Sequence, residues 1–202
     1  MRAAGFFYTF VYILLLLAAF VLPYFSAEGY NVVRHSLSEL GAQSAPNGWM
    51  MNAVFILLSA VTAWLGTIVL RRFWLPFYLL CFFVISLGLT AIYHHAPITE
   101  TLYLEREHVM HSIFSTITGV VFSVYCVAML LTLQHRLDKA LAFFMLCLAV
   151  GLSLLIVIFP DFTGVFQRVL FFTAFGWIFY SLVTFKVAPK INQGRNQSHF
   201  QQ

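Results

Sequence analysis

Charged residues are scarce in this chain of 202 residues, and their scarcity indicates the class of protein. Asp, Glu, Lys and Arg make up 9% of the sequence, whereas hydrophobic residues make up 61%. A soluble domain carries about a quarter charged residues, so this composition indicates a lipid-facing surface rather than merely a large core. The net charge of +4 is no nucleic-acid signal, because the basic residues are scattered at segment ends without an aromatic–basic stripe.

Cysteine and proline are also scarce, and their positions exclude further classes. The three cysteines, Cys81, Cys126 and Cys147, each lie inside an apolar run. They form no C-x-x-C pair, so the sequence indicates neither a disulfide framework nor a zinc knuckle. The six prolines lie at or near the ends of apolar runs. The interrupted mid-membrane helices that are frequent in secondary transporters are therefore not expected.

Six apolar runs are long enough to cross a bilayer. A helix of about 20 residues spans the roughly 30 Å of hydrocarbon, where every backbone polar group must be paired internally. The runs cover about residues 6–25, 50–70, 74–93, 108–133, 140–159 and 165–187. We therefore predict an all-α fold, a polytopic bundle of six transmembrane helices forming one domain over residues 1–188. The polar residues 189–202 are expected to form a disordered cytoplasmic tail.

The positions of Lys and Arg predict the orientation of this bundle. If the N-terminus lies inside, the outer segments hold three of these residues, Arg34, Arg106 and Arg168. The inner segments then hold the other eight, which are Arg2, Arg71, Arg72, Arg136, Lys139, Lys186, Lys190 and Arg195. This asymmetry fits the positive-inside rule. We expect a multi-pass membrane protein with both termini in the cytoplasm.

The first outer loop contains a short helix signal. Ser36 and Glu39 form an S-x-x-E capping box, and Gly41 is a suitable helix stop. We favour a capping role for Ser36. An alternative is that this helix enters the bundle and presents His35 and Ser38 to a cavity, with Ser38 as a candidate catalytic residue.

The fourth apolar run has one polar or small face. At 100° per residue, this face carries Glu105, His108, His111, Ser112, Ser115, Gly119 and Ser123. Such a stripe in a membrane helix faces other helices or a wet cavity. For the small residues of this face, Ser115, Gly119 and Ser123, we favour close helix packing. The facing series in the second run would be Ser59, Ala63 and Thr67.

The histidines at the top of this face are candidate metal ligands. His108 and His111, with His94 or His95 from the preceding run, suit Zn²⁺ or another divalent first-row metal. Glu105 or Glu107 is the candidate general base for a metal-bound water. The spacing is not H-E-x-x-H, so no metalloprotease motif is present. The alternative is a set of hydrogen-bonded histidines without a metal.

The third outer loop adds one acid and one cation. Asp161 or Thr163 is a candidate cap for the sixth run. Arg168 lies about one turn inside that run and needs a partner. One interpretation is an ion pair with Glu105, Glu107 or Asp161. The other is a clamp for an anionic head group, shared with Arg34 or Arg106.

Three segments carry a family resemblance. HSLSELGA over 35–42, the start of the fourth run around His111, and GVFQR over 164–168, which includes Gln167, resemble the bacterial membrane family known as domain of unknown function 998. The resemblance implies a six-helix protein of the bacterial inner membrane and supplies no substrate. The loop HHAPITETLYLEREH is longer and richer in His and Glu than the family pattern. A looser likeness, in residue types alone, links the chain to alkaline-ceramidase-type membrane hydrolases.

These features leave three functions open. The first is an outward-facing, metal-assisted hydrolase of a lipid or other amphiphile. The second is a non-enzymatic binder or transporter of a lipid or small molecule. The third is a structural accessory protein in which the polar cluster is a cap. In each case membrane lipids are the expected partners.

Overall fold

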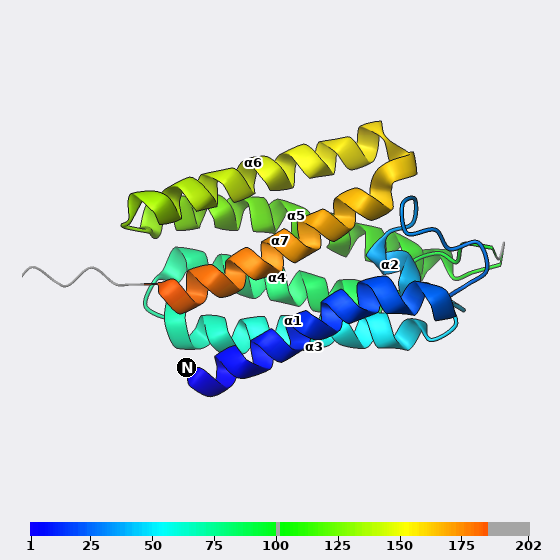
Figure 1. The fold of residues 1–202 in the computed structure, drawn as a ribbon, viewed down its shortest axis with the longest axis horizontal. Coiled ribbons are helices and arrows are strands. Elements are labelled where there is room, and N and C mark those ends of the chain that lie inside the picture. The colour runs from blue at the N-terminus through cyan, green and yellow to red at the C-terminus, as the bar shows by residue number, and fades with distance from the viewer. Residues whose placement is uncertain (100–101, 186–202) are drawn as a thin grey trace, which may run out of the picture.

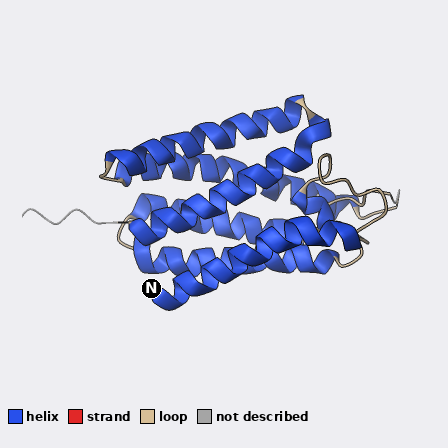
Figure 2. Cartoon of the chain, in the orientation of Figure 1, coloured by secondary structure: helices blue, strands red, loops and turns tan. Residues whose placement is uncertain are grey.

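The computed structural model describes residues 1–99 and 102–185 of the chain. The predicted tail over 189–202 and the end of the sixth predicted run lie outside these residues. Six long helices dominate: α1 (Arg2–Val21), α3 (Gly48–Leu70), α4 (Trp74–Ile92), α5 (Glu105–Thr132), α6 (Arg136–Ile158) and α7 (Thr163–Thr184). Three short elements are η1 (Leu22–Phe25), α2 (Leu37–Leu40) and η2 (Pro160–Phe162). The described part of the chain contains no strand (Figure 2).

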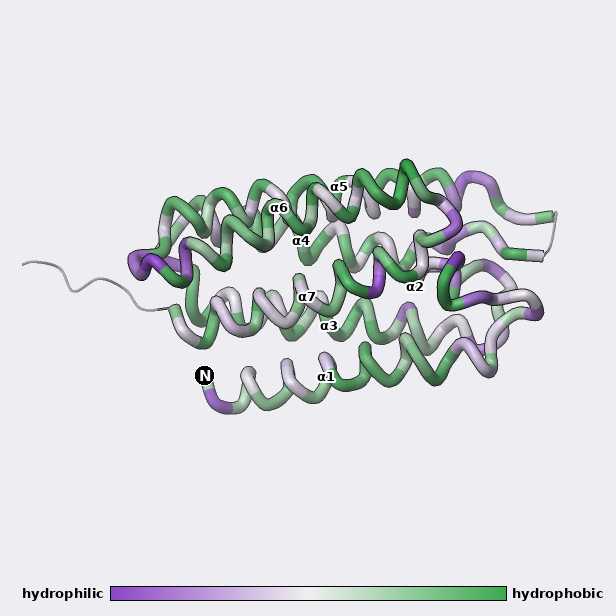
Figure 3. The backbone as a smooth tube through the Cα atoms, turned by 45° about the horizontal axis from the view of Figure 1, so that its top comes forward, coloured by the Kyte–Doolittle hydropathy of each residue, from purple (hydrophilic) through white to green (hydrophobic). Residues whose placement is uncertain are grey.

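The six long helices agree with the predicted apolar runs to within about four residues at each end. Each is long and apolar enough to cross a membrane. Large apolar side chains are exposed along them, among them Phe6, Phe82 and Leu131. Figure 3 shows hydrophobic residues along the lengths of the helices and hydrophilic residues gathered near their ends. The fold is therefore the all-helical membrane bundle that the sequence predicts.

Each helix buries one stripe against its neighbours. In α1 the buried residues are Ala4, Tyr8, Val11, Leu15 and Ala19. Their spacing of three and four residues places them on one helix face. The Tyr8 hydroxyl donates to the Phe175 carbonyl at 2.9 Å, which joins α1 to α7 across the core.

The helices pack in a chain of neighbours that leaves one gap. The main contacts run from α1 to α3, then to α4 and α5, while α7 lies against α1 and α3. The main partners of α6 are α5 and α7, which are not themselves major partners of each other. Helix α6 therefore lies at the edge of the bundle and bridges α5 and α7 (Figure 1).

The two ends of the bundle differ. One end has the N-terminus and the tight turns between α3 and α4 and between α5 and α6 (Figure 1). The other end has α2 and the long connections before α3 and α5. We call this second end the loop end and define it by residues 22–47, 93–99, 102–104 and 159–162. The candidate functional residues of the sequence lie at or near the loop end.

Candidate functional site

The short helix α2 forms as predicted. The Ser36 hydroxyl accepts a hydrogen bond from the Glu39 backbone N–H at 3.2 Å, and the Glu39 carboxylate accepts from the Ser36 N–H at 2.6 Å. This reciprocal pair is the expected capping box. Leu37, Ser38 and Leu40 are buried, so α2 is tucked into the bundle rather than lying on its surface.

The start of α7 packs against residues 22–47, which join α1 to α3 and which we call the first connection. The Gln167 side-chain oxygen accepts from the Leu37 backbone N–H at 2.5 Å, which satisfies a donor in the first turn of α2. A Cβ at Gly164 would collide with the backbone carbonyls of Val32 and His35. The HSLSELGA and GVFQR segments, far apart in sequence, thus form one structural unit.

The buried side chain of Arg168 joins the first connection to α1 and α7. Arg168 is 4% exposed, and its guanidinium donates five hydrogen bonds. Its acceptors are the carbonyls of Val32, His35, Gly164 and Ala19 at 2.9–3.3 Å and the Tyr30 hydroxyl at 2.7 Å. Burial raises the pKa of the Tyr30 phenol, which stays protonated and donates in turn to the Ser36 carbonyl.

The expected ion pair of Arg168 with an acid is wrong for the described residues. Asp161 instead pairs with Arg34 at 3.4 Å, and both side chains are largely exposed. Asp161 and Thr163 do not cap α7 either, because its N-cap is Phe162 with no side-chain cap hydrogen bond. Backbone carbonyls therefore take the place of the acid that one of the two sequence interpretations assigned to Arg168.

The segment between α4 and α5, described over residues 93–99 and 102–104, we call the second connection. It is held by His94, Glu107 and Gln43. His94 Nδ1 lies 2.8 Å from the Glu107 carboxylate. The Gln43 amide accepts from the Leu104 N–H at 2.8 Å and donates to the Leu104 carbonyl at 3.0 Å. Glu107, one of the two candidate bases, is thus engaged with a histidine at the loop end. Glu105, the other, is exposed.

His111 has a fixed tautomer. Its Nδ1 lies 2.8 Å from two carbonyl oxygens, those of Thr90 and Tyr93 at the end of α4. Carbonyl oxygens only accept, so Nδ1 carries the hydrogen and the neutral ring has its lone pair on Nε2. The side chain is 4% exposed. A buried ring with a defined acceptor nitrogen can serve as a base, a metal ligand or a hydrogen-bond acceptor.

Three histidine rings meet beside this position. The His95 ring centroid lies 4.7 Å from that of His108 and 5.3 Å from that of His111. His108 Nδ1 accepts from the Ala96 N–H at 3.2 Å, so its neutral ring is protonated at Nε2. In the described residues no three His, Cys, Asp or Glu side chains are arranged to hold a metal ion. The metal-ligand role of these histidines stays a prediction.

Two cavities open beside these residues. The first, of about 510 Å³, we call the vestibule. Its wall consists of Arg34, His35, Ser36, Ser38, Glu39, His95, His111, Ser112, Ser115, Pro160, Asp161, Thr163 and Gln167. It lies at the loop end and is mainly polar.

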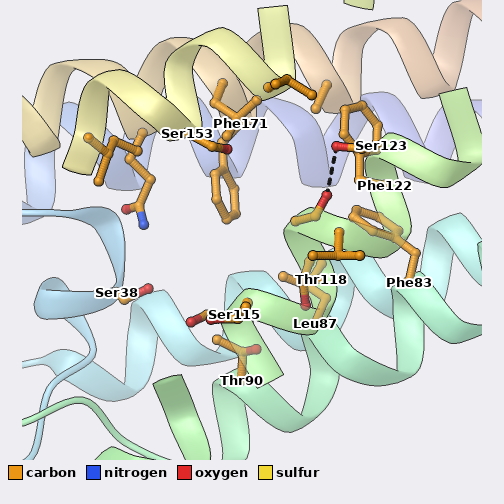
Figure 4. Close-up of a pocket in the computed structure, with 18 of the residues that line it drawn as sticks. Ser38, Phe83, Leu87, Thr90, Ser115, Thr118, Phe122, Ser123, Ser153 and Phe171 are labelled. Atoms are coloured by element: carbon orange, nitrogen blue, oxygen red, sulfur yellow. Dashed lines mark hydrogen bonds between the residues drawn. The ribbon is translucent and has the colours of Figure 1, made fainter. Parts of the chain in front are cut away.

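The second cavity, of about 570 Å³, we call the groove. Its polar wall residues are Ser38, Thr90, Ser115, Thr116, Thr118, Ser123, Ser153 and Gln167. Its remaining wall residues are Phe83 and Leu87 of α4, Gly119, Val120 and Phe122 of α5, Val150, Leu154, Ile156 and Val157 of α6, and Leu170, Phe171, Ala174 and Phe175 of α7. Figure 4 shows Ser38 at one end of the groove and Phe122 and Ser123 at the other.

The polar face of α5 lines these cavities. Ser115, Gly119 and Ser123 border the groove, and His111 and Ser112 border the vestibule. A Cβ at Gly119 would meet nothing within 4 Å. The interpretation of this stripe as packing against a series in α3 is therefore wrong. The helical spacing identified the face correctly, and the face lines a void rather than a neighbouring helix.

The predicted site residues divide into two groups. Those that border the vestibule are Arg34, His35, Ser38, His95, His111, Asp161 and Gln167. Those that border neither cavity are His94, Glu105, Arg106, Glu107, His108 and Arg168. Sequence reasoning missed the α6 and α7 walls of the groove and the linking roles of Tyr30 and Gln43. Only Gly164 and Gln167, within GVFQR, carried a signal for the packing of α7 against the first connection.

The helices and the two cavities define the chain as a six-helix membrane bundle with a vestibule at the loop end and an adjacent groove that shares three wall residues with it. The family model described as Protein of unknown function (DUF998) matches residues 10–184, and the chain belongs to this family. Searches of the curated proteins and of the solved structures found no match.

Proposed function

We propose that this protein binds an amphiphile, with the polar head in the vestibule and the hydrocarbon chain in the groove. The observation that carries the proposal is that the two cavities are neighbours, with Ser38, Ser115 and Gln167 in the wall of both. One polar and one largely apolar compartment, side by side, match the two parts of such a molecule. Both volumes fall in the usual range of about 300–1,000 Å³ for ligand pockets.

The rim of the groove supports entry from the bilayer. Val120, Leu154 and Val157 border the groove and are 58–78% exposed on the surface of the bundle. These helices are apolar enough to lie in lipid, so the rim side chains face acyl chains. A lipid tail can therefore move sideways into the groove without crossing water.

We propose further that the loop end faces away from the cytoplasm of a bacterial inner membrane. Arg2, Arg71, Arg72, Arg136 and Lys139 lie at the opposite end, which fits the positive-inside rule. In a variant without native cysteines, Glu28→Cys should react with a membrane-impermeant maleimide in intact spheroplasts, and Arg72→Cys only after lysis. The reverse labelling would overturn this orientation.

Filling the groove should abolish amphiphile binding. Gly119 borders the groove with open space where a side chain would point, so Gly119→Leu places an isobutyl group in the void. Gly151→Leu on α6 is the matched control, since its added side chain also meets nothing within 4 Å and lies outside both cavities. Both changes replace a helical glycine and gain about 1 kcal/mol of helix propensity.

The measurement is thermal unfolding of the full chain in phosphatidylcholine nanodiscs. A panel of single-chain amphiphiles with one shared oleyl chain is titrated as a mole fraction of the disc lipid. A ligand that binds only the native state raises the unfolding midpoint in a saturable way. We expect saturable stabilisation of the wild type and of Gly151→Leu by at least one amphiphile, and none for Gly119→Leu. Equal responses of all three proteins would refute a groove site.

Metal-assisted hydrolysis of a bound amphiphile is the second candidate. It rests on the closeness of the His95, His108 and His111 rings, which would have to rearrange to hold a metal. His111 presents a free Nε2, and His95 Nδ1 lies 2.9 Å from the Ala96 carbonyl, which leaves the His95 Nε2 free as well. His108 would have to exchange its hydrogen bond from Ala96 for a metal bond.

Elemental mass spectrometry of protein purified without a metal-affinity tag tests this candidate. About one Zn, Mn or Fe per chain, lost in His111→Ala and kept in the His94→Ala control, is the expected result. No metal in the wild type, even after metal is added back, would end the metallohydrolase interpretation.

A further inference from the structure

We infer that the head group received by the vestibule is uncharged and carries hydroxyl groups. This inference rests on the proposed amphiphile site and names its ligand class. It follows from the unpaired hydrogen-bonding atoms of His111, Gln167 and Ser38, all three of which border the vestibule.

His111 requires a donor. Its Nδ1–H is used by the carbonyls at the end of α4, and its Nε2 has no partner among residues 1–99 and 102–185. In the described structure this nitrogen is not among the fully enclosed atoms that lack a partner, so it is open to the vestibule. A ligand that displaces water there has to donate a hydrogen bond to Nε2, because leaving that acceptor unpaired would cost about 1–3 kcal/mol.

Gln167 requires an acceptor. Its side-chain oxygen is held by the Leu37 N–H, which fixes the amide orientation and leaves the –NH₂ group as a pure donor. In the described structure the fully enclosed side-chain atoms without a partner are those of Ser26, Thr62 and Tyr125. The unpaired amide nitrogen of Gln167 and the unpaired hydroxyl of Ser38 are therefore open to the cavities that they border.

A hydroxyl satisfies both requirements, because it donates and accepts. An ionised phosphate or carboxylate has no hydrogen for His111 Nε2, and an ammonium has no lone pair for Gln167. The walls add acceptors, since the Ser112 and Ser115 hydroxyls donate to backbone carbonyls at 2.9 and 3.0 Å and keep their lone pairs.

The charges around the vestibule point the same way. Arg34 is paired with Asp161, Arg168 is consumed by backbone carbonyls, and Arg106 borders neither cavity. Glu39 adds a carboxylate to the wall. The vestibule wall therefore carries one arginine, Arg34, against two carboxylates, Glu39 and Asp161, and this balance of charge disfavours an anionic head group.

Three amphiphiles with the same oleyl chain distinguish the head groups in the nanodisc assay at pH 8, where a phosphate monoester is a dianion. They are 1-O-oleylglycerol, oleyl phosphate and oleylamine, and only the first carries hydroxyl groups. We expect 1-O-oleylglycerol to bind about tenfold more tightly than either charged analogue, in line with one or two extra hydrogen bonds. His111→Asn keeps a donor near the position of Nδ1 and deletes the Nε2 acceptor, so this advantage should fall about tenfold.

His94→Asn is the matched control, because His94 lies at the loop end and borders neither cavity. Should His111→Asn fail to fold, Ser38→Ala serves instead, with the buried Ser59→Ala of α3 as its control. Equal or tighter binding of a charged analogue that remains sensitive to Gly119→Leu would overturn the hydroxyl inference and leave the amphiphile site intact. No saturable binding of any analogue would overturn both.

Discussion

Replacing Arg168 with methionine is expected to lower the free energy of unfolding by ~3 kcal/mol or more. Methionine keeps most of the length and apolar volume of the side chain but donates no hydrogen bond. The carbonyls of Val32 and His35 would then lose a charged donor inside the protein, and each such loss costs about 1–3 kcal/mol. The measurement is denaturant unfolding of the purified chain in detergent micelles.

Arg106→Met is the control, since Arg106 is exposed and is the second residue of α5. It should change the stability by less than about 0.5 kcal/mol. Arg168→Lys should fall between the two, because an ammonium has three donors and lacks the planar fork of the guanidinium. An Arg168→Met protein as stable as Arg106→Met would show that the buried guanidinium does not hold the first connection.

Replacing Gly164 with alanine should be the second most damaging change, although alanine is the better helix former. The added Cβ would collide with backbone oxygens of Val32 and His35, which cannot rotate away as a side chain can. Overpacking of this kind costs about 1–3 kcal/mol, which outweighs a helix-propensity gain of about 1 kcal/mol or less at this first helical turn. The displaced connection should also weaken amphiphile binding in the nanodisc assay.

Gly119→Ala is the comparison for this prediction. It makes the same chemical change in a long helix, but into open space. It should stabilise the protein by up to about 1 kcal/mol. If Gly164→Ala behaves in the same way, the close approach of the first connection to α7 is not a constraint on the fold.

The helical architecture was predictable from sequence because the bilayer permits few solutions. An apolar run of about 20 residues has to be a helix in lipid, so run length alone predicted six spans. The capping box of Ser36 and Glu39 was also predictable, because both of its hydrogen bonds lie within four residues.

The site was less predictable because its geometry depends on contacts between distant segments. Helical spacing identified the face of α5 that carries His111 and Gly119, but not whether a helix or a void lies opposite. Arg168 was recognised as a buried cation in need of partners. Its partners are backbone carbonyls, which leave no trace in a sequence, rather than one of the few acids.

The marginal position of α6 has a mechanical consequence. This helix forms one wall of the groove, and its main contacts are with α5 and α7, which form two others. Outward rocking of α6 would widen the groove while breaking contacts only along those two seams. The packing of α1, α3 and α4 would act as a fixed frame. A groove built in this way can widen through the movement of one helix, α6, while the rest of the bundle keeps its packing.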